Sequence, residues 1–332
     1  MNRFSVIIPV YNRPDEVDEL LASLAHQTCR NFEVIIVEDG STIPCREAVD
    51  RYRDQLDINY IYKENEGRSI ARNVGIEAST GNYLVFFDSD CVIPPQYFET
   101  VDKALTEHPA DCYGGPDAAH DSFSDTQKAI NYAMTSFWTT GGIRGGKVQL
   151  EKFVPRTFNT GFSRQVYDCV GGFREMFSED IDMSTRIKNA GFSIVLLRDA
   201  YVYHKRRISF KKFMRQVYVF GMSRITLKLL YPGSLKIVHT LPALFVIGCI
   251  ALIALSCTIS PWFLIPLAAY VLLLFVSALI STRSVKISLM AIPAAFIQLW
   301  GYGVGFIKAF TLKILLRRGR NIEEEIQMRK GK

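Results

Sequence analysis

Two carboxylates one residue apart follow an apolar run in the first third of the chain. The run occupies residues 83–87 and leads into Asp88, Ser89 and Asp90. Such a run is typical of a strand that is buried on both faces. Because open α/β sheets bind ligands beyond the carboxyl ends of their strands, the acids are expected beside a substrate. Oxygen ligands suit Mg²⁺ or Mn²⁺, which complete their shells with water and substrate phosphates. A polar turn that holds no ion is the alternative interpretation.

The residues around this pair alternate between strand and helix patterns. Apolar strands are expected at residues 4–11, 32–37, 59–62 and 83–88, and helices at 14–24, 45–56 and 69–78. Pro14 followed by two acids is typical of a helix start. The alternation predicts an α/β fold with a parallel sheet and right-handed crossovers.

Four motifs in this region carry a family resemblance. In order they are VIIPVYN (6–12), VEDGS (37–41), NEGRSIARN (65–73) and DSD (88–90). Residues 4–205 thereby resemble the family 2 glycosyltransferases, which have the Rossmann-like GT-A fold. The resemblance implies a nucleoside-diphosphate sugar as donor, with a UDP-sugar expected first.

The resemblance also implies a donor site, formed by Pro9, Tyr11, Asp39, Ser41, Arg72 and Asp88. Tyr11 is expected to stack on the base, and Asp39 to accept a hydrogen bond from a base N–H. Arg72, near a helix start, is expected to bind the diphosphate. Asp88 is expected to face the ribose or a water-bridged metal. The alternative is structural: Tyr11 covers the core and Arg72 pairs with an acid.

The second half of the family pattern also occurs. The motifs FNTGFSR (158–164) and GGF (171–173) precede Glu179 and Asp180. An inverting sugar transfer needs a base for the proton of the acceptor hydroxyl. Asp180 is the expected catalytic base and Glu179 the next candidate, and their adjacency, together with nearby donor phosphates, is expected to raise a carboxyl pKa. Alternatively, the acids offset a helix dipole, with Ser178 as N-cap.

Further residues are expected around this centre. The resemblance implies that His204 joins Asp90 on the metal, while a surface histidine is the alternative. Asp182 and Arg186, four residues apart, are expected to form a local ion pair. The basic residues after His204 are expected to neutralise the leaving diphosphate or to contact lipid headgroups; they are Lys205, Arg206 and Arg207.

The polar, glycine-rich residues 117–156 are expected to form an acceptor loop. Glycines permit close approach of the backbone to a ligand. Three cations of this segment would contact an anionic acceptor: Arg144, Lys147 and Arg156. A solvated basic face is the alternative.

The composition combines an ordinary α/β protein with an apolar C-terminal part. The 332 residues are 48% hydrophobic and carry a net charge of +6. Basic residues cluster at 205–228 and 313–330, on either side of the apolar part, which favours an anionic membrane surface over nucleic acid. The seven cysteines show no metal-ligand spacing and are expected to be reduced thiols. No signal-peptide pattern precedes the first strand, so the catalytic part is expected in the cytosol.

Residues 206–236 mix aromatic and basic side chains at helical spacing. This pattern predicts an amphipathic helix in the membrane interface. Processive members of the family carry the motif Gln-x-x-Arg-Trp in this region, whereas residues 215–221 read RQVYVFG. The departure favours transfer of a single sugar over polymer synthesis.

The apolar tail breaks into runs at 241–257, 262–280 and 289–310. The first two are about long enough to cross a ~30 Å hydrocarbon core and predict a hairpin. The third is expected to span as well. If it spans, the basic residues after it lie outside, against the positive-inside rule. Pro293 and the glycines also weaken the run, so a bent, re-entrant or shallow helix is the alternative.

Together these observations predict a catalytic domain at 1–205, an amphipathic segment at 206–236, a transmembrane region at 237–311 with two or three helices, and a charged cytosolic or external tail at 312–332. The expected function is a multi-pass, inner-membrane inverting glycosyltransferase of cell envelope polysaccharide biosynthesis. Its acceptor would be lipid-linked or a membrane-proximal glycan, and a homo-oligomer is compatible with the sequence. A polyprenyl-phosphate glycosyltransferase and a non-catalytic membrane scaffold are the alternatives.

Overall fold

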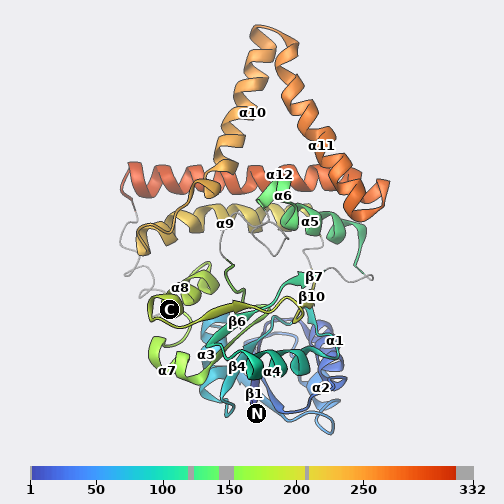
Figure 1. Cartoon of the computed structure of the whole chain (residues 1–332), viewed down its shortest axis with the longest axis vertical. Helices are drawn as coiled ribbons and strands as arrows, with labels where there is room; N and C mark the ends of the chain where they lie inside the picture. Colours follow the sequence, from blue (N-terminus) through green and yellow to red (C-terminus); the bar gives the residue numbers. More distant parts are fainter. Residues whose placement is uncertain (1, 119–122, 142–152, 206–208, 319–332) are drawn as a thin grey trace. The chain divides into compact units, whose positions relative to one another are not determined.

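The computed structural model describes residues 2–118, 123–141, 153–205 and 209–318. The chain divides into two compact units (Figure 1). The first contains the sheets and consists mainly of residues 1–120 and 153–205, and the second consists of residues 121–152 and 206–327. A segment from the middle of the chain therefore groups with the late helices. Arg144, Lys147, Arg206 and Arg207 lie outside the described residues.

A seven-stranded sheet forms the centre of the first unit. Its spatial order is β3 (Ile58–Lys63), β2 (Phe32–Asp39), β1 (Phe4–Val10), β4 (Tyr83–Phe86), β8 (Thr160–Ser163), β6 (Cys112–Gly114) and β9 (Ile194–Leu196). β8 runs antiparallel to both neighbours, so the prediction of a parallel sheet is wrong at this strand. The chain leaves the sheet at the end of β6 and returns at that same edge, where Gly114 pairs with Thr160. The returning strand, β8, therefore runs antiparallel to its neighbours.

Helices cover both faces of this sheet. One face carries α1 (Pro14–Ala25), α2 (Arg46–Asp50) and α4 (Tyr97–Glu107), and the other carries α3 (Arg68–Glu77), α7 (Arg164–Val170) and α8 (Glu179–Asn189). The continuous apolar runs read from the sequence follow from this double cover: Val6 and Ile8 pack into one core and Ile7 into the other. The predicted α/β class is confirmed.

A second, three-stranded sheet brings distant residues together. It has the order β5 (Cys91–Val92), β10 (Val202–His204) and β7 (Asp117–Ala118). His204 stands opposite Cys91 in the antiparallel β5–β10 pair. Val202 stands opposite Asp117 in the parallel β10–β7 pair.

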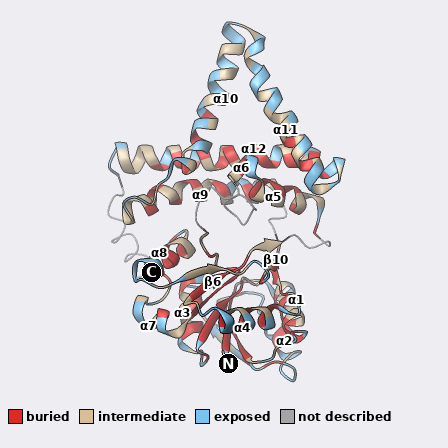
Figure 2. Cartoon of the chain, in the orientation of Figure 1, coloured by how far each residue is buried: buried red, intermediate tan, exposed pale blue. Residues whose placement is uncertain are grey.

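The second unit is helical. It contains α5 (Asp125–Thr135), α6 (Phe137–Thr140), α9 (Phe210–Leu230), η1 (Ile237–His239), α10 (Leu241–Thr258), η2 (Pro261–Leu264), α11 (Ile265–Thr282), α12 (Val285–Ala309) and the π-helix η3 (Phe310–Leu315). Three helical segments of the described chain are long and apolar enough to cross a membrane, namely Leu241–Thr258, Pro261–Thr282 and Val285–Leu315. Figure 2 shows α10 and α11 largely exposed, whereas α9 and α12 bury long stripes.

Candidate active site

The carboxyl ends of β1, β2 and β4 meet at one edge of the large sheet. β1 lies between the other two, and all three run parallel. Tyr11 follows β1 with its side chain 50% exposed, as base stacking requires. Asp39 is the last residue of β2, and Asp88 follows β4 after the buried Phe87. Three residues that are predicted to bind the donor therefore lie at this edge of the sheet: Tyr11, Asp39 and Asp88.

Asp39 organises the turn that leads into α3. Its carboxylate accepts hydrogen bonds from Nζ of Lys63 (2.8 Å) and from the backbone N–H groups of Glu66 (3.0 Å) and Gly67 (2.9 Å). Gly67 has φ of 99°, which favours glycine. Asp39 therefore shapes the start of α3, and its expected contact with a base N–H stays a prediction.

Ser41 ties the loop after β2 to the loop after β1. Its hydroxyl donates to Oε1 of Glu38 and accepts from the backbone N–H of Asn12 at 2.7 Å. Oδ1 of Asn12 accepts from the backbone N–H of Thr42 at 2.8 Å and of Ile43 at 3.0 Å. These bonds join the loops after β1 and β2, and Pro9 lies partly buried in β1; its expected part in donor binding stays a prediction.

Arg72 is buried between two carboxylates, with its side chain 1% exposed. It donates to Oδ1 of Asp88 at 2.8 Å and to Oε1 of Glu179 at 3.0 Å. Arg68, one turn earlier in α3, donates to Oε2 of Glu179 at 2.8 Å. The ring of Phe173 lies 5.5 Å from the Arg72 guanidinium carbon. Arg72 thus connects the end of β4 with the start of α8, and the diphosphate contact expected of it stays a prediction.

His204 and Asp90 form the candidate metal site. Nε2 of His204 lies 3.1 Å from Oδ1 of Asp90, and the backbone N–H of Lys205 donates to the carbonyl of Asp90 at 3.0 Å. Ligand atoms of Asp90, Cys91 and His204 lie within 4.8 Å of one another. Burial, followed by the charges of Asp90 and Asp88, raises the pKa of the Cys91 thiol well above its usual value. Mn²⁺ and Mg²⁺ prefer oxygen ligands to thiolate, so the carboxylate of Asp90 and the imidazole of His204 are the candidate ligands for either ion.

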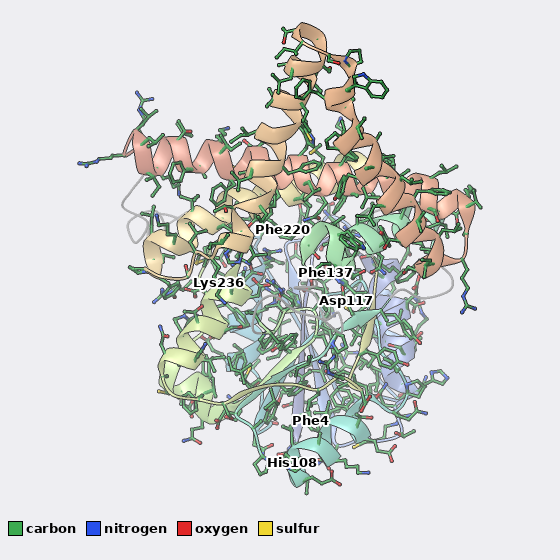
Figure 3. The ribbon with its side chains drawn as sticks, turned by 45° about the horizontal axis from the view of Figure 1, so that its top comes forward. Phe4, His108, Asp117, Phe137, Phe220 and Lys236 are labelled. Atoms are coloured by element: carbon green, nitrogen blue, oxygen red, sulfur yellow. The ribbon has the colours of Figure 1, made fainter. Side chains whose placement is uncertain are left out.

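The imidazole of His204 is held from two further sides. Its Nδ1 lies 3.9 Å from Oδ2 of Asp117, whose side chain is 3% exposed and is labelled in Figure 3. The ring stacks on Phe158 at a centroid distance of 4.4 Å. Metal-bound histidines commonly turn their second nitrogen toward a carboxylate, which fixes ring orientation and tautomer.

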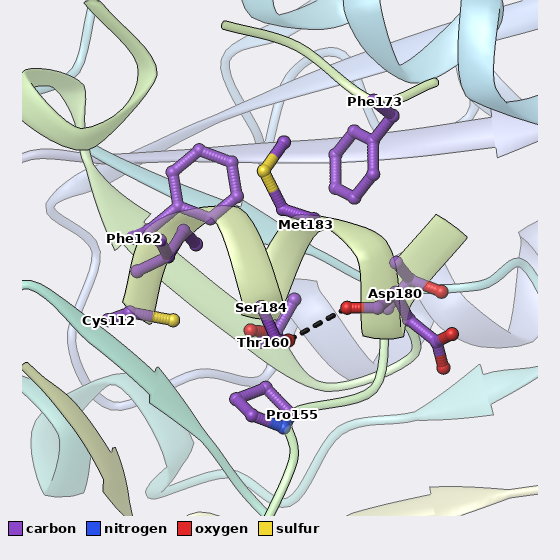
Figure 4. Close-up of a pocket in the computed structure, with 10 residues that line it drawn as sticks. Cys112, Pro155, Thr160, Phe162, Phe173, Asp180, Met183 and Ser184 are labelled. Carbon is purple, nitrogen blue, oxygen red and sulfur yellow. Dashed lines mark hydrogen bonds between the residues drawn. The ribbon is translucent and has the colours of Figure 1, made fainter. Parts of the chain in front are cut away.

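Asp180 lies at the start of α8 beside an apolar pocket (Figure 4). Its Oδ2 accepts from Arg156 at 3.0 Å and its Oδ1 from the backbone N–H of Ile181 at 2.8 Å. Burial alone would raise the pKa of Asp180, but Arg156, this backbone bond and the charge of Arg68 outweigh it and lower the pKa. The expectation of a raised pKa is therefore wrong. The lowered pKa favours the ionised carboxylate, which can accept a proton.

The start of α8 does not show the helix cap that the alternative interpretation expected, in which Ser178 caps the helix and the acids offset its dipole. Ser178 occupies the N-cap position with φ of 65° and makes no side-chain capping hydrogen bond. Both oxygens of Glu179 face arginines rather than the helix N–H groups. The predicted ion pair of Asp182 with Arg186 is present, with 2.9 Å between Oδ2 and Nε.

Several site residues were missed in the sequence. Arg68 belongs to the motif that contains Arg72 and stands one turn before it, so helical spacing could have shown it. Asn12 directly follows the predicted Tyr11 within the first motif. Asp117 carries no such signal, because only the pairing of β7 with β10 brings it to His204.

Comparison with known proteins identifies the fold. A search of solved structures finds a mannosyltransferase, PcManGT from Pyrobaculum calidifontis, with a TM-score of 0.61 and 20% sequence identity over 90% of this chain and 87% of that chain. This likeness confirms the predicted GT-A fold.

Among curated proteins, the glycosyltransferase GlyA of Streptococcus pneumoniae is 40% identical over 33% of this chain and 16% of its own length. The validoxylamine A glucosyltransferase of Streptomyces hygroscopicus subsp. jinggangensis is 29% identical over 59% of this chain and 54% of its own. The glycosyltransferase AglE of Haloferax volcanii is 27% identical over 74% and 80%. The first of these relatives is therefore matched over a small part of its length.

The profile of glycosyl transferase family 2 matches residues 5–171, a stretch that includes β1, β4 and the motifs between them. The chain therefore belongs to glycosyl transferase family 2.

Proposed function

We propose that this protein is a membrane-anchored, metal-dependent, inverting glycosyltransferase. It transfers one hexose from a nucleoside-diphosphate sugar to a lipid-linked or membrane-proximal acceptor. The observation that carries the proposal is the pairing of His204 with Asp90 at 3.1 Å, beside the ion pair of the partly exposed Asp88 with the buried Arg72. Family membership supports the nucleotide-sugar donor. The related fold of PcManGT was solved with GDP-Man and Mn²⁺, so guanosine donors join the UDP-sugars as candidates.

The donor would lie along the edge formed by β1, β2 and β4. Tyr11 offers an exposed ring for the base, with Pro9, Asp39 and Ser41 behind it. Asp90 and His204 would hold a divalent cation, which when bound neutralises charge on the diphosphate. Arg72 orients Asp88, since it donates to that carboxylate from a buried position.

Asp180 would take the acceptor proton. The acceptor oxygen attacks the anomeric carbon from the side opposite the diphosphate, and the bond to the diphosphate breaks with its electron pair leaving on that group. Its hydroxyl proton passes to the ionised Asp180 carboxylate. Glu179 is a weaker candidate, because its side chain is only 3% exposed between Arg68 and Arg72, whereas that of Asp180 is 17% exposed.

The C-terminal helices would attach the enzyme to the inner face of the cytoplasmic membrane. The three candidate spans have mean hydropathies of 2.4, 2.6 and 1.5. Lysine and arginine at both ends of this region favour a cytosolic orientation of the catalytic unit. An enzyme held at this surface would act on an acceptor that is held there too.

A non-catalytic scaffold is less consistent with the site. An arginine buried between two carboxylates has a desolvation cost that can exceed its coulombic gain. A fold retained for assembly alone has no need of that cluster.

The test is a donor screen with the purified full-length protein in detergent. GDP- and UDP-sugars are supplied with Mn²⁺ and a membrane lipid extract, and products are followed by mass spectrometry and by the anomeric signals in NMR. We expect one donor to be consumed, with inversion at the anomeric carbon. Absence of any donor turnover, or a retained configuration, would contradict the proposal.

A further inference from the structure

We propose that α12 does not cross the membrane. It lies along the cytosolic interface together with α9, and only the hairpin of α10 and α11 enters the hydrocarbon. The chain therefore ends on the side where it begins. This inference rests on the proposed membrane attachment and is independent of the sugar transfer. Its first support is burial: half of the α12 span is buried inside the structure, against 17% and 11% for the spans that contain α10 and α11.

Glycines allow α12 and α9 to pack backbone against backbone. A Cβ atom added at Gly305 would lie 2.1 Å from the carbonyl oxygen of Tyr218, and one added at Gly221 would lie 2.0 Å from that of Tyr302. A Cβ atom added at Gly301 would lie 2.4 Å from the side-chain methyl Cγ2 of Val217. Small residues at this spacing permit close helix approach in membrane proteins. The glycines that weakened the third run in the sequence therefore have a packing role.

The contact between α9 and α12 continues beyond the glycines. Nζ of Lys308 lies 5.7 Å from the ring centroid of Tyr218, and Nζ of Lys313 donates to Oγ1 of Thr226 at 3.2 Å. Phe213 and Val217 of α9 share a buried cluster with Ala294 of α12. α12 therefore lies beside α9 from its middle to its end (Figure 1).

The first turns of α12 pack on α5. Ile287 and Ala291 share a buried cluster with Ala129 and Tyr132, and Lys286 pairs with Asp125 at 2.7 Å between Nζ and Oδ2. α5 follows β7 in the chain and α9 follows β10, so both come directly from the catalytic unit. Both ends of α12 therefore contact segments tethered to the same side of the membrane.

α9 is poorly suited to cross the hydrocarbon. Its basic residues extend over its whole length; they are Lys211, Lys212, Arg215, Arg224 and Lys228. On insertion scales each such residue costs roughly 2.5–3.5 kcal/mol at a helix centre, whereas at the interface it contacts headgroups. The 25 residues of α12 would reach ~37 Å and could span. Because α12 packs along α9, which is poorly suited to cross, we expect α12 to lie at the interface as well.

The hairpin has the opposite character. Apolar residues are exposed around α10 and α11, including Ile247, Ile250, Leu272 and Val276. Its base meets α12 where Gly303 approaches the carbonyl of Pro242, and where the rings of Phe245, Tyr270 and Phe296 cluster. Figure 1 shows α12 running across the base of this hairpin. With two crossings, Arg283, Lys308 and Arg317 all stay inside, whereas a third crossing would place the last cation outside.

The experiment uses the full chain fused at its C-terminus to green fluorescent protein or to alkaline phosphatase in a bacterial host. We expect fluorescence, no phosphatase activity, and membranes that retain the protein in carbonate. An active C-terminal phosphatase in carbonate-resistant protein would overturn the inference and leave the anchoring intact. Protein released by carbonate would overturn the anchoring and this inference with it, while the donor screen would be unaffected.

An independent arm introduces one cysteine at a time into a background in which the two exposed cysteines of the described chain, Cys169 and Cys257, are replaced by serine, and labels it with a membrane-impermeant maleimide. Ile259→Cys, at the hairpin turn, is expected to react from outside, and Leu316→Cys only after lysis. Labelling of Leu316→Cys in intact cells would overturn the inference. Gly305→Leu tests the packing, with Gly248→Leu as control because nothing lies within 4 Å of a Cβ there. We expect a lower melting temperature for Gly305→Leu alone, and equal melting of both variants would contradict the close contact of α9 and α12.

Discussion

Nε2 of His204 lies 3.1 Å from Oδ1 of Asp90, although the two residues are far apart in the chain. The antiparallel pairing of β10 with β5 produces this contact. On the other side of the same ring, Asp117 lies 3.9 Å from Nδ1. The imidazole is therefore held between two carboxylates, of which one would bind the ion and the other would orient the ring.

Asp117→Asn should weaken Mn²⁺ binding by roughly 10- to 100-fold, because outer partners of a ligating histidine contribute that much to metal affinity. Electron paramagnetic resonance of free Mn²⁺ measures this binding without turnover. The exposed Asp168 offers a control, and Asp168→Asn should leave affinity unchanged. Equal affinity of the two variants would remove Asp117 from the account.

Asp180→Asn should lower turnover by about 10²-fold or more and leave donor affinity near normal, because it removes the proton acceptor but keeps the shape. Steady-state kinetics and calorimetric titration of the donor separate these effects. Turnover within a few-fold of wild type would assign the base to another residue.

Arg156→Gln should shift the acidic limb of kcat to higher pH. In the wild type, Arg156 opposes the effect of burial and lowers the pKa of Asp180. The base works only when ionised, so loss of the arginine lets protonation begin at a higher pH. By the same linkage, the lowered pKa stabilises the fold above the unfolded-state pKa of about 3.9, and this stability is lost as pH falls through the folded-state pKa. A pH–rate profile that coincides with wild type would contradict this role of Arg156.

Glu179→Ala should act mainly on stability. The substitution leaves buried Arg72 with one carboxylate, and breaking a buried ion pair costs about 3–5 kcal/mol. Thermal unfolding in detergent measures the loss, with the exposed Glu77→Ala expected to stay within about 0.5 kcal/mol of wild type. A stable Glu179→Ala protein that has lost turnover would instead assign Glu179 a direct catalytic role.

Much of the catalytic unit was predictable because its signals are local. Apolar runs identified β1, β2 and β4, and the motif order indicated the GT-A fold before any tertiary contact was known. His204 and Asp90 were assigned to one site through the family resemblance, and β5 and β10 bring them together.

The rest depends on contacts between residues far apart in the chain. No pattern near Asp180 in the sequence indicates that Arg156 contacts it. The direction of the pKa shift of Asp180 could therefore not be predicted from the adjacent Glu179. The backward course of β8 depends on where the chain re-enters the sheet. The apolar residues of α5, such as Ala129 and Ile130, look like those of any amphipathic helix, and only packing shows that they belong with α9 and α12.

The most direct test of the central claim is calorimetric titration of the full-length protein with the donor found in the screen, with and without Mn²⁺. The variants are Asp90→Ala and His204→Ala, and the exposed His108→Ala is the control. The account predicts Mn²⁺-dependent donor binding in wild type and control, and loss of that dependence in both site variants. Donor affinity that is the same in all four proteins, or that is unchanged when the metal is chelated, would contradict it.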